Sequence, residues 1–149
     1  MPRKIVLAVT AALISVTAVA AAPMQTIPAR QNNFKQMGRA QKAIGDELKM
    51  GNPDLGLIRT HANTIANLAS QVSRWFPRGT GKESGAKTGA LPGIWQQTAR
   101  FQSSANQLTN AARGLQRTAA GGDVTQIRSS LSAVGGTCKG CHVTFKGEK

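Results

Sequence analysis

The chain has 149 residues, enough for one domain with a real hydrophobic core, and no shift in composition along it indicates a second domain. Aromatic residues make up only 4% of the chain and tyrosine is absent, whereas Ala, Leu, Gln, Lys and Arg are plentiful, which favours an all-α protein over a β-sandwich. The formal net charge is +13, but the basic residues form no dense run and no aromatic residues interleave with them, which argues against a nucleic-acid-binding protein.

Residues 1–22 are predicted to be a signal peptide. Arg3 and Lys4 precede an apolar run of small residues that ends in three alanines, so A-x-A cleavage sites lie just before Pro23. An uncleaved membrane anchor is the alternative, because this run approaches spanning length; no other segment could span a membrane. We therefore expect a mature domain of residues 23–149, exported to the bacterial periplasm and without stable membrane insertion.

The mature domain stays strongly basic, because removal of Arg3 and Lys4 lowers the formal charge only from +13 to +11. We interpret most of this charge as a solvated surface. Electrostatic steering toward an acidic redox partner is the sharper alternative.

Four helices are predicted from Pro28 onward. Gly51–Pro53 separates the first two, with Asn52 as the N-cap of the second helix and Pro53 in its first turn, and Pro77 stops the second helix. The segment from Arg78 to Pro92 is rich in Gly, Ser and Lys and is predicted to be the longest loop. The third helix is expected to end at Gly121–Gly122, and Asp123 to cap the fourth, with Gln126 reaching back to it.

Each predicted helix has one apolar face, and the faces of the second and fourth helices also carry reactive residues. His61 lies in the second stripe, Cys138 and Cys141 lie in the fourth, and Gly135–Gly136 should weaken the fourth helix. Four such helices with two short connections and one longer loop are typical of an antiparallel, up-down-up-down four-helix bundle. The stripes are Phe34, Met37, Ile44 and Leu48; Ile58, His61, Ile65, Leu68, Val72 and Trp75; Ile94, Thr98, Phe101, Ala105, Leu108, Ala112 and Leu115; and Val124, Ile127, Leu131, Val134, Cys138, Cys141 and Phe145.

The fourth helix ends in the pattern Cys-x-x-Cys-His, formed by Cys138, Cys141 and His142. This pattern is the attachment signature of c-type haem, since two thiols one helical turn apart can each form a thioether with a porphyrin vinyl group while the adjacent imidazole reaches the iron. The alternatives are a disulfide, which this helical spacing strains, a zinc site completed by His61, and two buried cysteines without chemistry. An exported chain with a histidine after the second cysteine favours haem c.

The sequence resembles the class II c-type cytochromes, the cytochrome c′ and cytochrome c-556 family. The resemblance extends over nearly the whole mature chain, although only its last motif is specific alone. It rests on Arg30–Gly38 (RQNNFKQMG), Trp75–Pro77, Leu91–Trp95 with Phe101, and Cys138–Lys146.

The resemblance implies one haem c, held by Cys138 and Cys141 through two thioethers, with His142 as the axial iron ligand. It also implies that Arg30 faces a haem propionate and that Phe34 meets the distal face of the iron. Since phenylalanine cannot ligate iron, Phe34 implies the five-coordinate, high-spin members of the family. The family commonly has Tyr and then Arg where this chain has Phe145 and Lys146, so a tyrosine hydrogen bond is absent and Lys146 either keeps the charge beside the haem or is a solvated terminal charge.

Two other side chains could be mistaken for a sixth ligand. Met37 lies on the same face as Arg30 and is interpreted as a core residue that packs against the haem, with iron ligation as the alternative. His61 is interpreted as a packed or rim histidine.

Two functions stay open. An apolar distal site under Phe34 would exclude water and anions and admit small uncharged gases such as nitric oxide and carbon monoxide. The alternative is a six-coordinate, low-spin electron carrier of the cytochrome c-556 type that serves a redox protein partner. No nucleophile stands beside a base and the carboxylates show no catalytic pairing, so an enzyme is not expected. Pairing into a homodimer through the first two helices, as in many relatives, is also left open.

Overall fold

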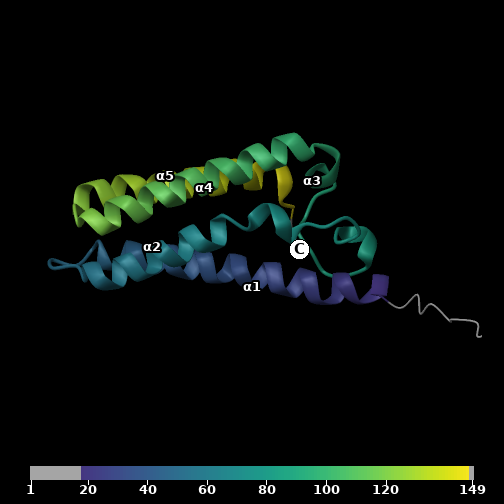
Figure 1. Cartoon of the computed structure of the whole chain (residues 1–149), viewed down its shortest axis with the longest axis horizontal. Coiled ribbons are helices and arrows are strands. Elements are labelled where there is room, and N and C mark those ends of the chain that lie inside the picture. Colours follow the sequence, from purple (N-terminus) through teal and green to yellow (C-terminus); the bar gives the residue numbers. More distant parts are fainter. Residues whose placement is uncertain (1–17, 148–149) are drawn as a thin grey trace, which may run out of the picture.

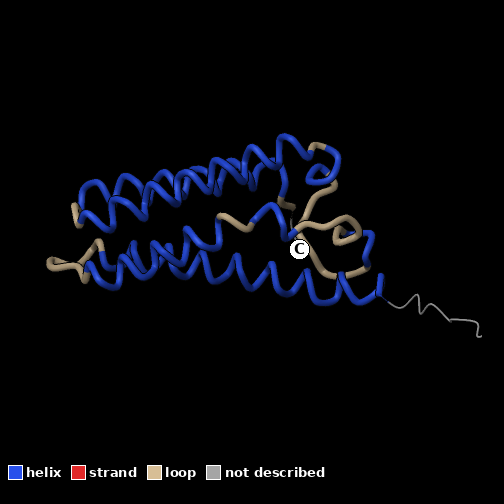
Figure 2. Tube along the Cα trace, in the orientation of Figure 1, coloured by secondary structure: helices blue, strands red, loops and turns tan. Residues whose placement is uncertain are grey.

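The computed structural model describes residues 18–147, and the side chains from Gln25 onward. Its four long helices are α1 (Ala18–Glu47), α2 (Leu55–Ala69), α4 (Thr98–Gly121) and α5 (Val124–Phe145), with a four-residue helix α3 (Gly93–Gln96) before α4. Two short 3-10 helices, Val72–Trp75 and Lys82–Ser84, lie between α2 and α3. The described residues form no β-strand (Figure 2), and the predicted all-α class is confirmed.

The four long helices form two layers. Helices α1 and α2 make one layer and α4 and α5 the other, and both short turns, α1–α2 and α4–α5, lie at the same end of the molecule (Figure 1). The loop after α2, helix α3 and the C-terminus lie toward the opposite end (Figure 1). The predicted antiparallel four-helix bundle is therefore confirmed.

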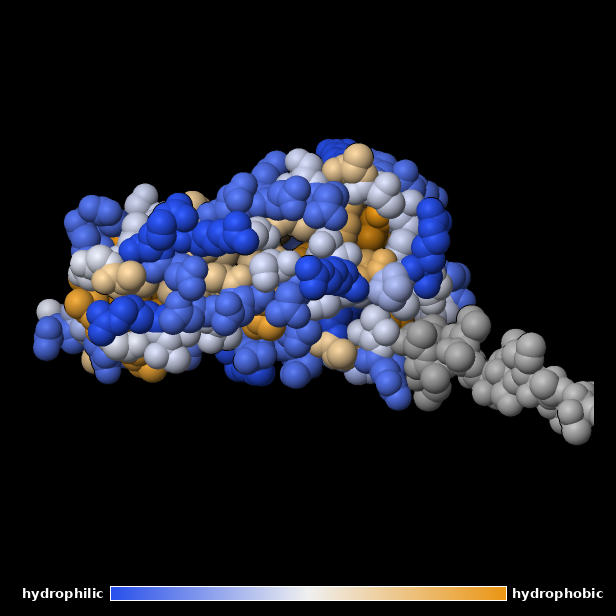
Figure 3. Space-filling model, in the orientation of Figure 1, coloured by the Kyte–Doolittle hydropathy of each residue, from blue (hydrophilic) through white to orange (hydrophobic). Residues whose placement is uncertain are grey.

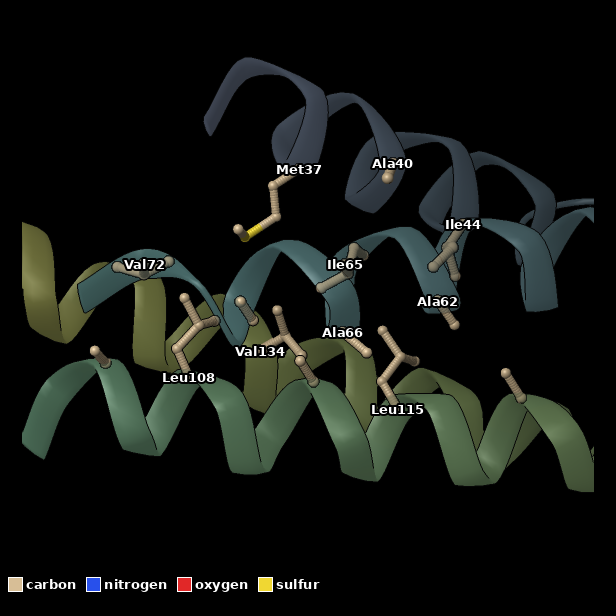
Figure 4. Close-up of a cluster of buried hydrophobic side chains, with 14 of the residues drawn as sticks. Met37, Ala40, Ile44, Ala62, Ile65, Ala66, Val72, Leu108, Leu115 and Val134 are labelled. Atoms are coloured by element: carbon tan, nitrogen blue, oxygen red, sulfur yellow. The ribbon is translucent and has the colours of Figure 1, made fainter. Parts of the chain in front are cut away.

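Small side chains let the two layers approach closely. Ala62 and Ala66 of α2 face Leu115 of α4 in the centre of the bundle (Figure 4). Alanine at these positions allows the helix axes to come together, so that branched side chains from neighbouring turns fill the space between them. The fully buried large residues include Ile44, Ile58, Ile65, Leu115, Ile127 and Val134.

The first helix begins earlier than predicted. We expected it from Pro28, whereas α1 is already helical at Ala18. The predicted signal peptide, residues 1–22, lies for the most part outside the described residues. In the part of the chain that the structure covers, no helix combines the length and the hydropathy needed to cross a bilayer.

The N-cap of the second helix was predicted at the wrong residue. Asp54, and not Asn52, caps α2: its Oδ1 accepts a hydrogen bond from the Leu57 N–H at 3.0 Å. The Asp54 N–H in turn donates to Oε2 of Glu47 at the end of α1, also at 3.0 Å. Asp54 is favoured because its carboxylate reaches the third N–H of the helix while its own N–H is satisfied by Glu47, so Pro53 lies outside the helix.

The second and third helices are also shorter than predicted. Helix α2 ends at Ala69, whose carbonyl accepts a hydrogen bond from Thr109 Oγ1 of α4, and the chain then tightens into a 3-10 turn that still buries Val72. The third helix breaks at Gln97, which has φ −119° and ψ 50°. This break turns α3 away from α4 and lets Trp95 Nε1 donate to the carbonyls of Phe76 and Pro77.

The α4–α5 turn agrees with the sequence prediction. Gly122 has φ 79° and ψ 6°, the left-handed conformation that glycine adopts without strain. Asp123 Oδ1 accepts from the N–H groups of Thr125 and Gln126, and the Gln126 side chain donates to Asp123 Oδ2. Helix α5 then runs without interruption through Gly135–Gly136, where a Cβ at 135 would lie 3.2 Å from Gln41 Nε2. A close approach of α1 thus accounts for the first glycine of the pair.

Candidate haem site

An apolar cavity of about 370 Å³ lies between α1, the loop after α2, α3, α4 and the C-terminal half of α5. All seven residues that the sequence analysis selected line it: Arg30, Phe34, Met37, Cys138, Cys141, His142 and Lys146. In the space-filling view, hydrophobic side chains show between hydrophilic ones near the end of the molecule that carries α3 (Figure 3). The fold therefore brings residues from both ends of the chain to one cavity.

Cys138, Cys141 and His142 lie on the last two turns of α5, where residues three and four apart share a face. Both cysteines are free thiols, partly buried and packed against the core. Burial raises the pKa of both thiols, and the Cys138 sulfur raises that of Cys141 further. The two thiols are thus protonated at neutral pH, one turn apart and on the same cavity wall.

His142 is suited to donate a nitrogen lone pair. Burial lowers its pKa, and the positive charge of Lys146 lowers it further, so the imidazole is neutral at neutral pH. A neutral imidazole is the form that ligates a metal. The residue also keeps one side open to solvent.

Helix α1 contributes two large apolar side chains to the cavity wall, next to polar ones. Phe34 is partly buried and Met37 is buried, with Met37 pointing from α1 into the interior towards the side of α4 that carries Leu108 (Figure 4). Val72, Leu108 and Met37 lie close together in this view, which is the packing role that the sequence analysis favoured for Met37. Its thioether nevertheless lies on the cavity wall.

All four phenylalanines of the chain line the cavity. Phe76 stands between Phe34 (ring centroids 6.2 Å apart) and Phe101 (5.0 Å), and Phe101 contacts Phe145 edge-to-face at 5.3 Å. These contacts connect α1, the loop after α2, α4 and α5 around the cavity. The sequence analysis had not assigned Phe76 and Phe101 to the site; the clustering of every phenylalanine at one end of the bundle was the available signal.

Arg30 has partners that the sequence did not reveal. It is only 3% exposed and donates to Thr80 Oγ1 (2.8 Å), the Thr80 carbonyl (2.6 Å) and Thr88 Oγ1 (2.8 Å), with its guanidinium carbon 4.6 Å from the centroid of the Phe76 ring. Burial lowers the pKa of Arg30, and the carboxylate of Glu83 opposes that shift. Arg30 therefore holds the loop at two points eight residues apart. That it faces a haem propionate stays a prediction.

The same loop is tied to the C-terminal end of α5. The Leu91 N–H donates to the Phe145 carbonyl (3.1 Å) and the Gly147 N–H to the Gly89 carbonyl (2.9 Å), forming an isolated bridge between Ala90 and Lys146. Through Arg30, Thr88 and this bridge, α1 is connected to the chain just after His142. The segment that was predicted to be the longest loop, because of its Gly, Ser and Lys content, is thus held in place as one wall of the cavity.

His61 lies apart from this site. It is on α2, partly buried, and does not line the cavity. The zinc site considered from the sequence needed His61 beside the two cysteines, and among the described residues no group of three or more His, Cys, Asp or Glu side chains is placed to hold a metal ion.

The residues present fit a haem. The cavity is apolar and bounded by four phenylalanines, as a flat hydrophobic macrocycle requires, and it opens next to two thiols and a neutral imidazole in the attachment order. Basic side chains, Lys35 and Lys146, also line it and match the negative charge of carboxylate substituents. Fold and cavity together define a four-helix-bundle protein with a c-type haem site.

Comparison with known proteins gives the family. The model of the cytochrome C′ family matches residues 25–146. Cytochrome c′ of Pararhodospirillum photometricum is 34% identical over 126 residues, covering 85% of this chain and 99% of that protein; cytochrome c′ of Rhodospirillum rubrum is 34% identical over 149 residues, covering 99% and 100%. The chain belongs to the cytochrome c′ family, whose members carry one covalently attached haem c. These relatives are cytochromes by name.

Solved structures agree. The crystal structure of cytochrome c′ from Thermochromatium tepidum is 28% identical, with a TM-score of 0.79 over 85% of this chain and 97% of that one. A cytochrome c′ described as showing ligand-controlled dimer dissociation is 26% identical, with a TM-score of 0.78 and the same coverage. A nitric oxide complex of a cytochrome c prime variant from Alcaligenes xylosoxidans has a TM-score of 0.76, covering 85% and 97%; at 23% identity this likeness shows the fold alone.

Proposed function

We propose that this chain is an exported, periplasmic haem protein whose main role is to bind small uncharged gases such as nitric oxide and carbon monoxide. In this proposal residues 1–22 are a cleaved signal peptide and residues 23–149 form the haem domain. Cys138 and Cys141 form the two thioethers and His142 is the axial ligand. The haem held by these residues would supply the binding of a diatomic ligand at its iron and a one-electron couple.

The observation that carries the proposal is the pair of phenylalanines, Phe34 and Phe76, in the predominantly apolar lining of the cavity. Phe34 and Phe76 meet there, and neither can ligate iron. An apolar wall disfavours entry of water and anions because they would lose hydration without gaining hydrogen bonds, whereas an uncharged diatomic gas loses little. The chain's own residues would thus select ligands by polarity.

Optical spectra of the purified holoprotein test this. We expect high-spin bands in the oxidised and reduced protein, and a change when carbon monoxide or nitric oxide is added to the reduced form. Low-spin bands that do not respond to either gas would contradict the proposal.

If the bands are low-spin, the Met37→Leu variant tests whether Met37 is the sixth ligand. Met37 is the thioether on the α1 wall of the cavity, so a gas response that appears only in Met37→Leu would assign it as the sixth ligand. Met50 is exposed in the turn after α1, and Met50→Leu is the matched control, which should leave the spectrum unchanged. A wild-type spectrum that both variants reproduce supports the packing role of Met37.

A second candidate function is one-electron transfer, and the exposure of the chain around His142 favours it. His142 and Val143 are both exposed, so the proposed axial ligand lies at the protein surface. An electron would therefore have a short path from a docked protein to the site. High-spin ligation does not exclude this role.

We further propose that the chain can pair into a homodimer, on the basis of the relative described with ligand-controlled dimer dissociation. Analytical ultracentrifugation with and without carbon monoxide tests this. A single monomeric species under both conditions would contradict it.

A further inference from the structure

The charges of the described residues are distributed unevenly along the bundle. Carboxylates gather at the end formed by the two short turns, where Asp46, Glu47 and Asp54 lie around the α1–α2 turn and Asp123 caps α5. Both ion pairs among residues 18–147, from Lys42 and from Lys49, use Asp46 at that end. The cavity end has one described carboxylate, Glu83.

Cations dominate the cavity end. Lys35 and Lys146 line the cavity, Lys87 lies on the loop held by Arg30, and Lys139 stands between the two cysteines; all four are exposed. The electrostatic potential is therefore more positive at the cavity end of the bundle than at the end of the two short turns. A field of this kind steers anionic partners and raises their association rate.

Within this positive end, α5 presents one exposed apolar side chain. Val143 is 78% exposed, the most exposed of the large hydrophobic residues described, and it follows His142 directly. Lys139 is four residues before it, so the two share one face of the helix, and Lys146 follows directly after the end of the helix. An apolar centre flanked by charges is the arrangement of a protein-docking surface.

The same face also carries two glycines, which no contact within the described chain requires. Gly136 and Gly140 precede Val143 by seven and three residues, and a Cβ added at either would meet nothing within 4 Å. Glycine inside a helix costs about 1 kcal/mol relative to alanine, and here no internal packing requires it. Two glycines at these positions leave room for another protein to approach the helix backbone next to His142.

From these observations we propose that Gly136, Lys139, Gly140, Val143 and Lys146 form a docking face for an acidic electron-transfer protein. The inference rests on the proposed function, in which haem is attached at Cys138 and Cys141 and ligated by His142. In the complex one electron would pass from the partner's reduced centre to ferric haem iron, or from ferrous haem iron to the partner's oxidised centre. No bond forms or breaks in either direction. The face has too few cations in sequence for a polybasic membrane or nucleic-acid site, so an acidic protein is the partner that it fits.

The test uses the holoprotein and a plant-type [2Fe–2S] ferredoxin as an acidic probe, whose potential of about −400 mV makes it a strong reductant. Stopped-flow absorbance gives the second-order rate of haem reduction. The variant Lys139→Glu with Val143→Asp removes a cation and the apolar centre, and neither residue lines the cavity. The matched control, Leu57→Asp with Arg59→Glu on α2, makes the same change in charge near the far end.

We expect the wild-type rate to fall steeply with ionic strength and the Lys139–Val143 variant to react about tenfold more slowly at low salt, with the control within about twofold of the wild type. Amide NMR shifts of α5 on addition of oxidised ferredoxin give a readout independent of the reaction. Equal rates for both variants, or shifts outside α5, would overturn the docking face. The docking face would also be overturned if the wild type bound anionic vesicles or DNA and the Lys139–Val143 variant lost this binding, while the rate of haem reduction by ferredoxin stayed unchanged.

The optical spectrum keeps this test separate from the proposed function. Normal haem bands in both variants together with equal reduction rates mean that the docking face is wrong while haem attachment stands. A wild-type protein that is loaded by a haem-attachment pathway and still carries no covalent haem means that the proposed function itself is wrong.

Discussion

Replacing Arg30 with methionine should release the loop from Arg78 to Pro92 from the rest of the domain. The change removes three hydrogen bonds of 2.6–2.8 Å from a buried charged donor to Thr80 and Thr88. At about 1.5 kcal/mol each, these bonds contribute about 4–5 kcal/mol to holding the loop closed. The variant no longer buries a charged guanidinium, which offsets part of this loss, so the closed loop should be destabilised by about 2–3 kcal/mol net. The population of the open loop should then rise roughly 30- to 160-fold.

Native digestion of the holoprotein with trypsin measures this opening. Arg78, Lys82 and Lys87 are exposed cleavage sites within the loop. Cleavage there should accelerate in proportion to the open population when reclosing is faster than cutting. Mass spectrometry of the fragments assigns the sites.

Two variants sharpen the interpretation. Arg39→Met removes an exposed arginine from the same helix and should leave loop cleavage unchanged. Arg30→Lys keeps the charge but cannot reach both threonines with a planar fork, so it should give an intermediate rate. Loop cleavage in Arg30→Met equal to that in Arg39→Met, together with an altered haem spectrum, would refute the reasoning and assign Arg30 to the haem.

Three further predictions concern the turns and the loop. Gly122→Ala should destabilise the protein by about 1–2 kcal/mol, because φ is 79° and the new Cβ would lie 3.3 Å from Leu55 Cδ1. In the control Gly121→Ala the new Cβ meets nothing within 4 Å, so the stability should not fall. Urea unfolding compares the two variants, and equal midpoints would contradict the conformational argument. The hydrogen bonds that the Asp123 carboxylate accepts, from the Gln126 N–H first, lower its pKa in the folded state. Its charge therefore stabilises the protein above the unfolded-state pKa, and this contribution is lost as pH falls through the folded-state pKa. The melting temperatures of wild type and Asp123→Asn should therefore converge in acid, and a constant gap between them would count against this. Trp95→Phe removes the donor to the carbonyls of Phe76 and Pro77 at 2.9 and 3.1 Å and should cost about 1–2 kcal/mol, and an unchanged unfolding midpoint would show that these bonds contribute nothing.

Local rules explain the helix boundaries that were predicted correctly, and contacts with other helices explain those that were not. Gly122 and Asp123 were predicted correctly because a left-handed glycine and an N-cap depend on neighbours within four residues. The prediction of Asn52 as the N-cap of α2 was wrong because the use of Asp54 as the N-cap depends on Glu47, a residue of the preceding helix. The end of α2 at Ala69 likewise depends on Thr109, forty residues away, which periodicity cannot indicate.

The sequence by itself determined the four amphipathic helices and the Cys-x-x-Cys-His attachment motif, because each is a pattern within one helix. The selection of Phe34 came from the resemblance to the family, and its place on the distal side of the haem stays a prediction. Only the tertiary structure decided how the cavity is closed. Arg30 binds Thr80 and Thr88, which are 50 and 58 residues further along, and the loop between them then pairs with the chain after His142. No local pattern marks these threonines, because their role arises only when burial of Arg30 leaves a charged donor that requires acceptors from a distant segment.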